Sequence, residues 1–481
     1  MLRKLGKDVA VYGGVDLLFR MAQFVVVPVY AHLLSVSDFG LLGLLTVTAT
    51  LLGMLLNLGV NNSVQRFYFD PETPEGERPA LVSTGLAQLL LSGIVTIALA
   101  FLILGNLREE VRSAYGIEWT LLVIVLATVL PDQIAQYTLD AVRLQFAPWK
   151  FFAIAIVKNL AGILLGLWLV LRWDMGVAGL LLGPLISAAA AVPIGLLMIR
   201  KDLALRFDRA VAKKVFHYGY PFVFAGAAYW VFGSMDRWLL VEMSDLVQVG
   251  LFSVALKFAA ALTFVISAFA QAWSPFAMRM RGEDPSYREN YARIFSAWFF
   301  LLAFLGLGLA LLAPEIMIYL TPREYWEAAP ILSVCAAGIV LYGTTQITVM
   351  GISLERRTML LTWGAWIAAG ANVVLNLLLI PHLGALGSAI ATLASYGLLT
   401  SAFLFWSQRL HPIPLERPRL VYCCAIVALS VAASLALAPM GVGLVPLAIK
   451  AAIVLAVLAG AFAVGIVDPS LYRQFIRRAA A

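Results

Sequence analysis

The sequence predicts an all-α polytopic membrane protein with about fourteen transmembrane helices. Apolar residues make up 62% of its 481 residues, against about half in soluble domains. The mean hydropathy is +0.91. Apolar runs such as 121–130, 425–439 and 451–467 approach the length that a helix needs to cross a hydrocarbon core of about 30 Å.

The expected helices follow one another with short connections, because polar or charged residues interrupt the apolar pattern at each proposed end. In chain order they cover 10–34, 41–68, 80–105, 117–141, 148–171, 176–199, 213–241, 247–278, 290–313, 327–353, 357–380, 384–408, 419–438 and 442–467. The start of the chain, MLRK, lacks a cleavable signal pattern, so we expect the first helix to serve as the uncleaved insertion signal. No connection is long enough to hold a soluble catalytic domain.

Two parts of the sequence resemble each other. One register pairs Gly162 with Gly370, Gly176 with Gly384, Gly179 with Gly387 and Ser187 with Ser395. This predicts two six-helix lobes, 1–203 and 208–412, related by a pseudo-two-fold axis along the membrane normal. The two additional helices of 419–467 have no counterpart, and we expect them to pack outside the lobes.

The net charge of +7 alone would suit a nucleic-acid partner, but the placement of the 34 Lys and Arg argues against one. Most of them fall in one alternate set of loops, while the opposite set carries Arg108, Arg112, Arg172 and Arg323. By the positive-inside rule, the basic loops and both termini are cytoplasmic. Lys450 lies inside the last helix, where we expect its side chain to reach the outer interface.

Ionisable residues inside apolar helices are costly and therefore suggest function. They include Asp16 and Arg20 in the first helix, Lys257 in the eighth and Lys158 in the fifth. Asp236 and Arg237 in the seventh lie closer to its outer end, where the Arg237 side chain could also reach the interface. Asp16 and Arg20 have the i, i+4 spacing of an ion pair. A structural pair and a cation that faces a cavity are compatible readings of Arg20.

Two helices carry one-sided polar stripes. The second has Asn57, Asn61 and Gln65, followed by Arg66, and the fourth has Asp132, Gln136 and Asp140, followed by Arg143. Such stripes line a water-filled cavity or form hydrogen bonds between helices. The cysteines lie inside apolar segments without metal-ligand spacing, so the sequence predicts no metal and no cofactor.

Several segments, in this order, resemble the oligosaccharide-lipid and polysaccharide repeat-unit flippases. They are LGV at 58–60, RFYFD at 66–70, DRWLL at 236–240, VGLFS at 249–253 followed by Lys257, QAWSPF at 271–276, APEI at 313–316, and Asn372, Asn376, Pro381, Gly384, Gly387 and Tyr396. The resemblance runs from about residue 5 to 410. The family belongs to the superfamily that also contains multidrug and toxin extrusion antiporters and lipid II flippases.

The resemblance implies a transporter of the cytoplasmic (inner) membrane rather than an enzyme. Its substrate would be an isoprenoid (pyro)phosphate-linked oligosaccharide, moved by alternating access, with membrane lipids and polysaccharide assembly proteins as its other partners. Arg20, Arg66, Arg237 and Lys257 would bind the phosphates, with Asn57 and Asn61 beside them. Two ways of energy coupling stay open: Asp16 or Asp236 could bind a proton or sodium ion, or the membrane potential could act directly on the cations. The acidic stretch 70–77 departs from the chemistry expected for anion capture.

Two other functions compete with this one. An ion-coupled drug or cation antiporter of the same superfamily would need buried carboxylates, whereas the deep charges here are mainly positive. A membrane-embedded glycan polymerase or glycosyltransferase would need an acid or base on a sizeable outer loop, and the outer loops here are short.

The predicted topology can be tested with reporter fusions. Fusions after Arg112 and Arg323 should report from outside the cell, and fusions after Arg209 and Arg288 from the cytoplasm, because the basic loops stay inside. The reverse pattern at two of these sites would contradict the topology.

Overall fold

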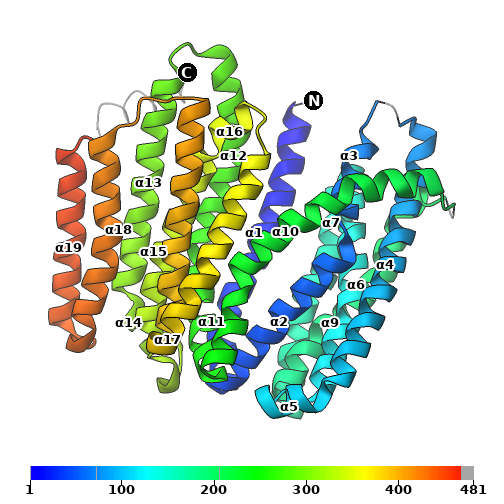
Figure 1. Cartoon of the computed structure of the whole chain (residues 1–481), viewed down its shortest axis with the longest axis horizontal. Helices are drawn as coiled ribbons and strands as arrows, with labels where there is room; N and C mark the ends of the chain where they lie inside the picture. The colour runs from blue at the N-terminus through cyan, green and yellow to red at the C-terminus, as the bar shows by residue number, and fades with distance from the viewer. Residues whose placement is uncertain (1, 72, 205, 467–481) are drawn as a thin grey trace. The chain divides into compact units, whose positions relative to one another are not determined.

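The chain folds into helices connected by short turns in the computed structural model, which describes residues 2–71, 73–204 and 206–466 (Figure 1). The side chains of 2–13, 15–17 and 20 lie outside that description. The described residues form no strand, and 11 helices are long and apolar enough to cross a membrane. The prediction of an all-α polytopic membrane protein is therefore confirmed, while the count of fourteen spans stays a prediction.

Two compact units make up the chain, Met1–Gly250 and Leu251–Ala481. The helices of unit 1 are α1 (Leu2–Leu33), α2 (Val36–Asn57), α3 (Val60–Tyr68), α4 (Arg78–Asn106), α5 (Arg108–Tyr115), α6 (Trp119–Leu144), α7 (Pro148–Ala155), the π-helix η2 (Ile156–Leu160), α8 (Ala161–Trp173), α9 (Gly176–Ile199) and α10 (Arg209–Met243). Those that begin at the boundary or in unit 2 are α11 (Leu246–Ala259), α12 (Ala261–Glu283), α13 (Tyr287–Leu311), α14 (Ala313–Leu320), α15 (Ala328–Thr348), α16 (Met350–Leu354), α17 (Met359–Leu410), α18 (Arg417–Leu437) and α19 (Leu444–Ala463).

Small residues let the helices of unit 1 approach closely. A Cβ on Gly183 of α9 would collide with the carbonyl oxygen of Gly162 in α8. A Cβ on Gly195 would collide with the Thr138 hydroxyl of α6 in the same way. Such contacts replace the hydrophobic driving force, which is missing between helices in lipid. They hold α6, α8 and α9 together behind the polar face of α6.

The expected helix 41–68 is two helices, because Leu58 and Gly59 both adopt left-handed backbone angles, with φ of 48° and 72°. Glycine tolerates this conformation at little cost. Gly59 also packs against Gly219 of α10 without room for a side chain, and the Ser63 hydroxyl donates to the Val215 carbonyl at 2.9 Å. α10 thus packs against α2 and α3, which places it in unit 1.

Three further differences concern where the expected helices are interrupted, connected or joined. The expected helix 247–278 is interrupted at Ala260 between α11 and α12. The expected outer connection 106–116 contains α5. α17 spans two expected helices, and Gly384 between them is non-helical at φ 53° and ψ −132°. The proposed lobe boundaries, 1–203, 208–412 and 419–467, stay a prediction.

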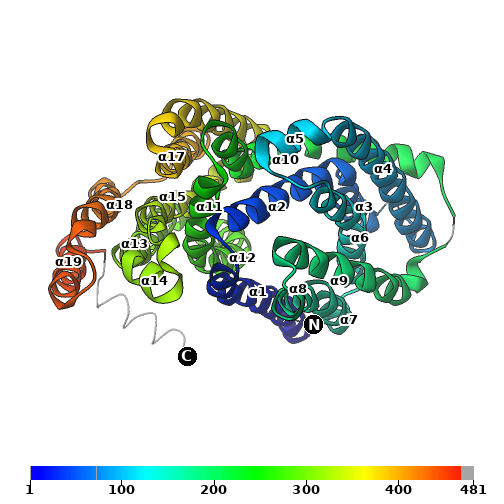
Figure 2. The same cartoon turned by 90° about the horizontal axis from the view of Figure 1, so that it is seen from below.

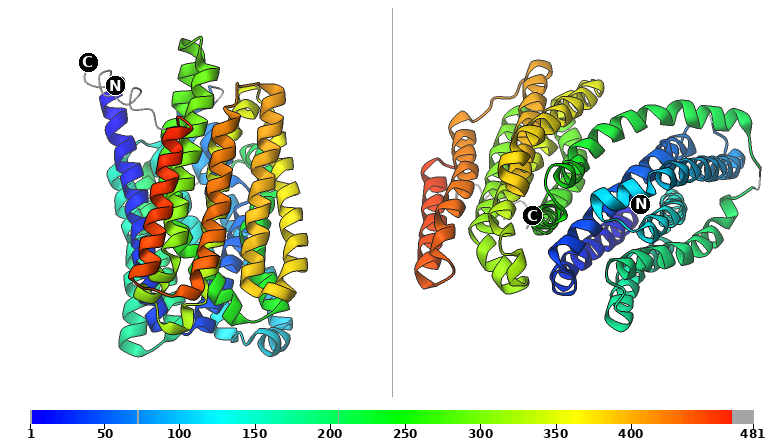
Figure 3. Two further views of the ribbon diagram at one scale, coloured as in Figure 1. Left: turned by 90° about the vertical axis from the view of Figure 1, so that its left-hand side faces the viewer. Right: turned by 60° about the horizontal axis from the view of Figure 1, so that its bottom comes forward.

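The most buried helix of unit 2 is α15, because 83% of its apolar stretch lies inside the protein. It packs against α13 and α17, and the Trp298 indole of α13 donates to the Gly343 carbonyl at 3.0 Å. The C-terminal helices lie beside these (Figures 2 and 3). α18 contacts α13 and α15, and α19 contacts α13.

Lys450 of α19 does not reach an aqueous interface, contrary to the expectation from sequence. Its side chain is 5% exposed and forms an ion pair with Glu315, in the first turn of α14, at 2.5 Å. Glu315 is itself 15% exposed. A buried lysine is stable in an apolar setting when a carboxylate compensates its charge, so this pair fixes α19 to the rest of unit 2.

Removing one partner of this pair should destabilise the protein. Lys450→Met leaves the Glu315 carboxylate buried and unpaired, a change that typically costs about 3–5 kcal/mol. We expect a lower thermal unfolding temperature for the purified variant. The Glu315→Gln, Lys450→Met double variant should recover most of the loss, and no recovery would show that the pair is not the cause.

Candidate functional site

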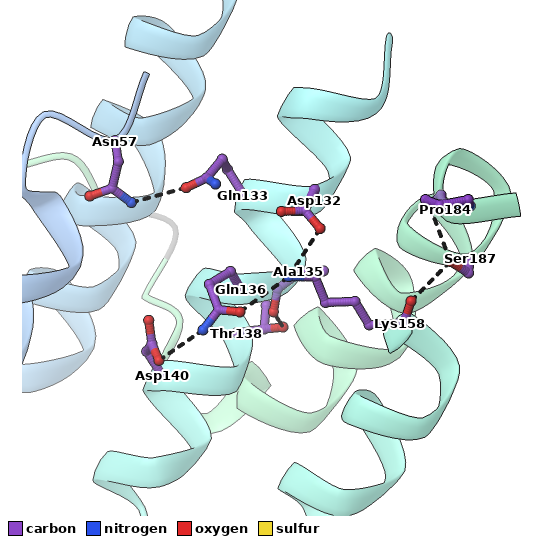
Figure 4. Close-up of polar contacts among 10 residues, drawn as sticks. All are labelled: Asn57, Asp132, Gln133, Ala135, Gln136, Thr138, Asp140, Lys158, Pro184 and Ser187. Carbon is purple, nitrogen blue, oxygen red and sulfur yellow. Dashed lines mark hydrogen bonds and ion pairs between the residues drawn. The ribbon is translucent and has the colours of Figure 1, made fainter. Parts of the chain in front are cut away.

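A network of partly buried polar side chains connects several helices of unit 1, and Figure 4 shows most of its members. Its members lie on α2, α3, α6 and the π-helix η2: Asn57, Asn61, Asp132, Gln133, Gln136, Asp140, Arg143 and Lys158. Apart from α3, the segments that carry them are otherwise apolar enough to cross a membrane. The network is therefore the strongest candidate for a functional site in this unit.

Asn57 and Asn61 connect α2 and α3 to α6. The Asn57 amide donates to Asn61 Oδ1 at 3.0 Å and to Gln133 Oε1 at 3.2 Å. Asn61 follows the break at Leu58 and Gly59, and its amide donates to Asp140 Oδ2 at 2.7 Å. The turn between α2 and α3 thus places two carboxamides against one face of α6.

Asp140 is the main acceptor of the network. Besides Asn61, it accepts from the Gln136 amide at 3.2 Å and lies 3.5 Å from the Arg143 guanidinium. Gln136 and Asp140 are at i, i+4 on α6, so both side chains lie on the same face. Two amide donors and a nearby guanidinium therefore stabilise this carboxylate, whose side chain is 28% exposed.

Lys158 lies at the other end of the network. Its ammonium lies 3.0 Å from Asp132 Oδ1 and donates to Gln136 Oε1 at 3.1 Å. The Lys158 side chain is 9% exposed, whereas that of Asp132 is 40% exposed. Burial thus falls mainly on the cation, and the carboxylate keeps access to the surroundings.

The backbone at Lys158 is irregular. Residues 156–160 form a π-helical turn, a feature that occurs often at functional sites. The Ser187 hydroxyl of α9 donates to the Lys158 carbonyl at 3.0 Å, which helps to satisfy a backbone group in this turn. The turn gives Lys158 a local geometry that a regular α-helix would not provide.

The structure brings together only part of the predicted site. Asn57 and Asn61 belong to the network. Arg66 lies exposed at the end of α3, and on α10 Asp236 is 2% exposed while the Arg237 guanidinium donates to the Gly233 carbonyl at 3.3 Å. Lys257 is exposed on α11. The side chains of Asp16 and Arg20 lie outside the described residues.

The structure adds residues that the predicted site left out. The polar stripe on α6 and the depth of Lys158 are visible in the sequence, but their pairing is not. Gln133 lies one position away from that stripe, so the pattern gave no signal for it. Asn61 and Asp140 show that the two stripes form hydrogen bonds with each other across helices.

The two partners of the buried ion pair should differ in their effect. Asp132→Asn leaves the nearly buried Lys158 ammonium with a neutral partner and should lower stability by a few kcal/mol. Lys158→Met leaves a carboxylate whose side chain is already 40% exposed and should cost less. Thermal unfolding of the purified variants would measure both changes. The Asp132→Asn, Lys158→Met double variant should be more stable than Asp132→Asn alone, and equal losses in the two single variants would contradict this assignment.

Comparison with known proteins points to polysaccharide export. Residues 5–281 match the family model described as "Polysaccharide biosynthesis protein". The chain is similar to the EPS I polysaccharide export inner membrane protein EpsE of Ralstonia solanacearum, with 26% identity over 345 residues, covering 69% of this chain and 77% of that protein. The EpsE protein of Ralstonia nicotianae is 28% identical over 352 residues, covering 69% of this chain and 76% of that protein.

Solved structures share the fold. The lipid II flippase MurJ in an inward closed conformation has a TM-score of 0.71 at 13% identity, covering 96% of this chain and 98% of that one. An inward-facing multidrug resistance transporter of the MATE family has a TM-score of 0.61 at 11% identity, covering 82% and 97%. The family match and the membrane helices show that the chain is a multi-pass membrane protein that belongs to the polysaccharide biosynthesis protein family.

Proposed function

We propose that this protein is a flippase that moves an isoprenoid (pyro)phosphate-linked oligosaccharide from the cytoplasmic to the outer leaflet of the inner membrane. The product would serve surface polysaccharide assembly. The observation that carries the proposal is the chain of amides and carboxylates inside unit 1 of a member of this family.

A lipid-linked glycan presents many hydroxyl groups that lose their water when they enter the membrane. Amides and carboxylates can accept and donate in place of that water, because each unsatisfied polar group costs free energy in an apolar setting. The Asn57 amide already donates hydrogen bonds to Asn61 and to Gln133. In the proposed mechanism, a sugar hydroxyl replaces one of these contacts without leaving a group unsatisfied.

The two phosphates would need cations. Arg20, Arg66 and Arg237 of unit 1 and Lys257 of unit 2 remain the proposed phosphate ligands. Arginine suits this role because its planar guanidinium forms two parallel hydrogen bonds to phosphate oxygens. Asp16 and Asp236 remain the proposed coupling residues for a proton or sodium ion, and both termini remain on the cytoplasmic side in the proposed topology.

The pairing within the network supports a glycan substrate over an organic cation. A drug or cation antiporter would offer a carboxylate to its substrate. In the network, however, Asp132 pairs with Lys158 and Asp140 lies beside Arg143. We also propose that the protein is not an enzyme, in keeping with the export and flippase names of its relatives.

The proposed phosphate ligands can be tested by substitution. Arg20→Ala and Lys257→Ala should each abolish delivery of polysaccharide to the surface in cells whose own copy is deleted. Expression and membrane insertion should remain normal. Arg20→Lys should restore delivery only in part, because an ammonium keeps the charge but loses the planar pair of donors.

A double variant separates binding from a structural role. If Arg20 only neutralises Asp16, then Asp16→Asn, Arg20→Gln should regain full transport at normal expression, and that result would defeat the binding role. Continued loss of transport in this variant would support it.

A further inference from the structure

Unit 1 has two adjacent hollows where α4, α5 and α6 meet, near the end that carries α5 in Figure 1. A polar pocket of about 360 Å³ is lined by Arg108, Arg112, Glu118, Trp119 and Thr120. An apolar groove of about 490 Å³ is lined by Ile94, Ile97, Ala98, Phe101, Leu102 and Leu130. The Phe101 ring of the groove meets the Trp119 ring of the pocket edge-on at 5.2 Å, so the two hollows are neighbours.

The polar pocket presents two arginines from one helix. Arg108 and Arg112 are at i, i+4 on α5, so both guanidiniums lie on the same face. Arg108 contacts Glu109 at 3.0 Å, with both side chains more than half exposed. Within the described part of the chain, Arg112 has no ion-pair partner. A phosphate group could therefore take donors from both arginines without breaking a buried ion pair.

α5 is fixed in place rather than loosely attached. It follows α4 directly and ends at Gly116, whose φ is 65°. The Tyr115 hydroxyl donates to the Glu242 carboxylate of α10 at 2.5 Å, and this hydrogen bond raises the pKa of Tyr115. The anchored helix keeps both arginines above the groove.

The lining of the groove on α4 covers Ile94–Leu102, and its deepest residue lies about one leaflet below the end of the helix. Ile94 lies twelve residues before the end of α4 at Asn106, or about 18 Å at 1.5 Å per residue. Half of a hydrocarbon core is about 15 Å. A chain that lies in the groove would therefore extend from the interface to the middle of the bilayer.

We propose that the two hollows form one binding site for an isoprenoid phosphate-linked saccharide. The isoprenoid chain would lie in the groove between α4 and α6, and the phosphate would contact Arg108 and Arg112. Glu118 would repel the phosphate but suits a sugar hydroxyl, which can donate to its carboxylate, and the Trp119 indole offers an apolar face to the sugar ring. The mixed charge of the pocket thus favours a phosphate that carries a sugar over a bare phosphate.

This inference rests on the proposed function and gives the substrate a second position. In the predicted topology α5 lies at the outer face, so the site would hold the lipid-linked sugar after it has crossed the membrane. It shares no residue with the proposed phosphate ligands or with the buried network.

Photo-crosslinking can test the site with the purified full-length protein in nanodiscs. The probe is a benzophenone-bearing farnesyl pyrophosphate, competed with unlabelled farnesyl pyrophosphate, farnesol or phosphatidylglycerol, and crosslinked peptides are mapped by mass spectrometry. Labelling should concentrate on 94–102 and 119–130. Farnesyl pyrophosphate should compete better than either farnesol or phosphatidylglycerol. A polyprenyl-linked saccharide should compete better still.

Matched variants separate the two hollows. Arg108→Gln, Arg112→Gln should weaken binding by about tenfold or more, because charge-assisted hydrogen bonds are lost. Arg172→Gln, an exposed arginine at the end of α8, is the control and should leave binding unchanged. Ala98→Trp should block the groove, whereas Leu99→Trp at the neighbouring exposed position outside the groove should not.

Equal competition by phosphatidylglycerol would mean that the groove holds bulk lipid only and would overturn the proposal. Unchanged binding in the double arginine variant, or equal effects of the two tryptophan variants, would do the same. Polysaccharide delivery in cells reports separately on the proposed function. Intact delivery that depends on Arg20, without crosslinking here, would reject this site and leave the flippase proposal standing.

Discussion

The ion pair between Lys158 and Asp132 is the constraint on which the interior of unit 1 depends. An ammonium this well buried among apolar helices needs a counter-charge and further acceptors. Asp132 supplies the first, and Gln136 supplies an acceptor. The Gln136 amide in turn donates to Asp140, which also accepts from the Asn61 amide. Asn61 accepts from the Asn57 amide, so the chain of hydrogen bonds extends from α6 to α2. One buried cation thus organises polar groups on three helices and a π-helical turn.

Close packing between neighbouring helices also supports this arrangement. Gly183 lets α9 approach α8, and Gly195 lets it approach α6. These contacts hold α6 and the turn at 156–160 at a fixed separation, so that a side chain on one can meet a side chain on the other. The glycines therefore contribute to the site although none of them contacts a polar side chain of the network.

Much of the architecture follows from the sequence, because helix length, apolar runs and loop charge respond directly to the membrane. The features that escaped prediction depend on tertiary contacts. The break at Gly59 is set by its contact with Gly219, which lies far away in the chain. Lys450 looked free to reach an interface until α14 placed Glu315 beside it. Asn57 and Asn61 could be selected as site residues from their spacing, but Gln133, the partner of Asn57, could not, because it lies outside the polar stripe on α6.

The pair of Lys450 and Glu315 also has a consequence for biogenesis. Glu315 is made before Lys450, and α14 can be in position before α19 leaves the ribosome. A helix with an uncompensated lysine settles poorly in lipid, so α19 gains its full stability only after it finds α14. The order of synthesis and the cost of an unpaired charge together make stable docking of α19 depend on a correctly placed α14. A chain whose second unit is misassembled would retain a poorly inserted C-terminal helix, the kind of defect that membrane quality control can detect.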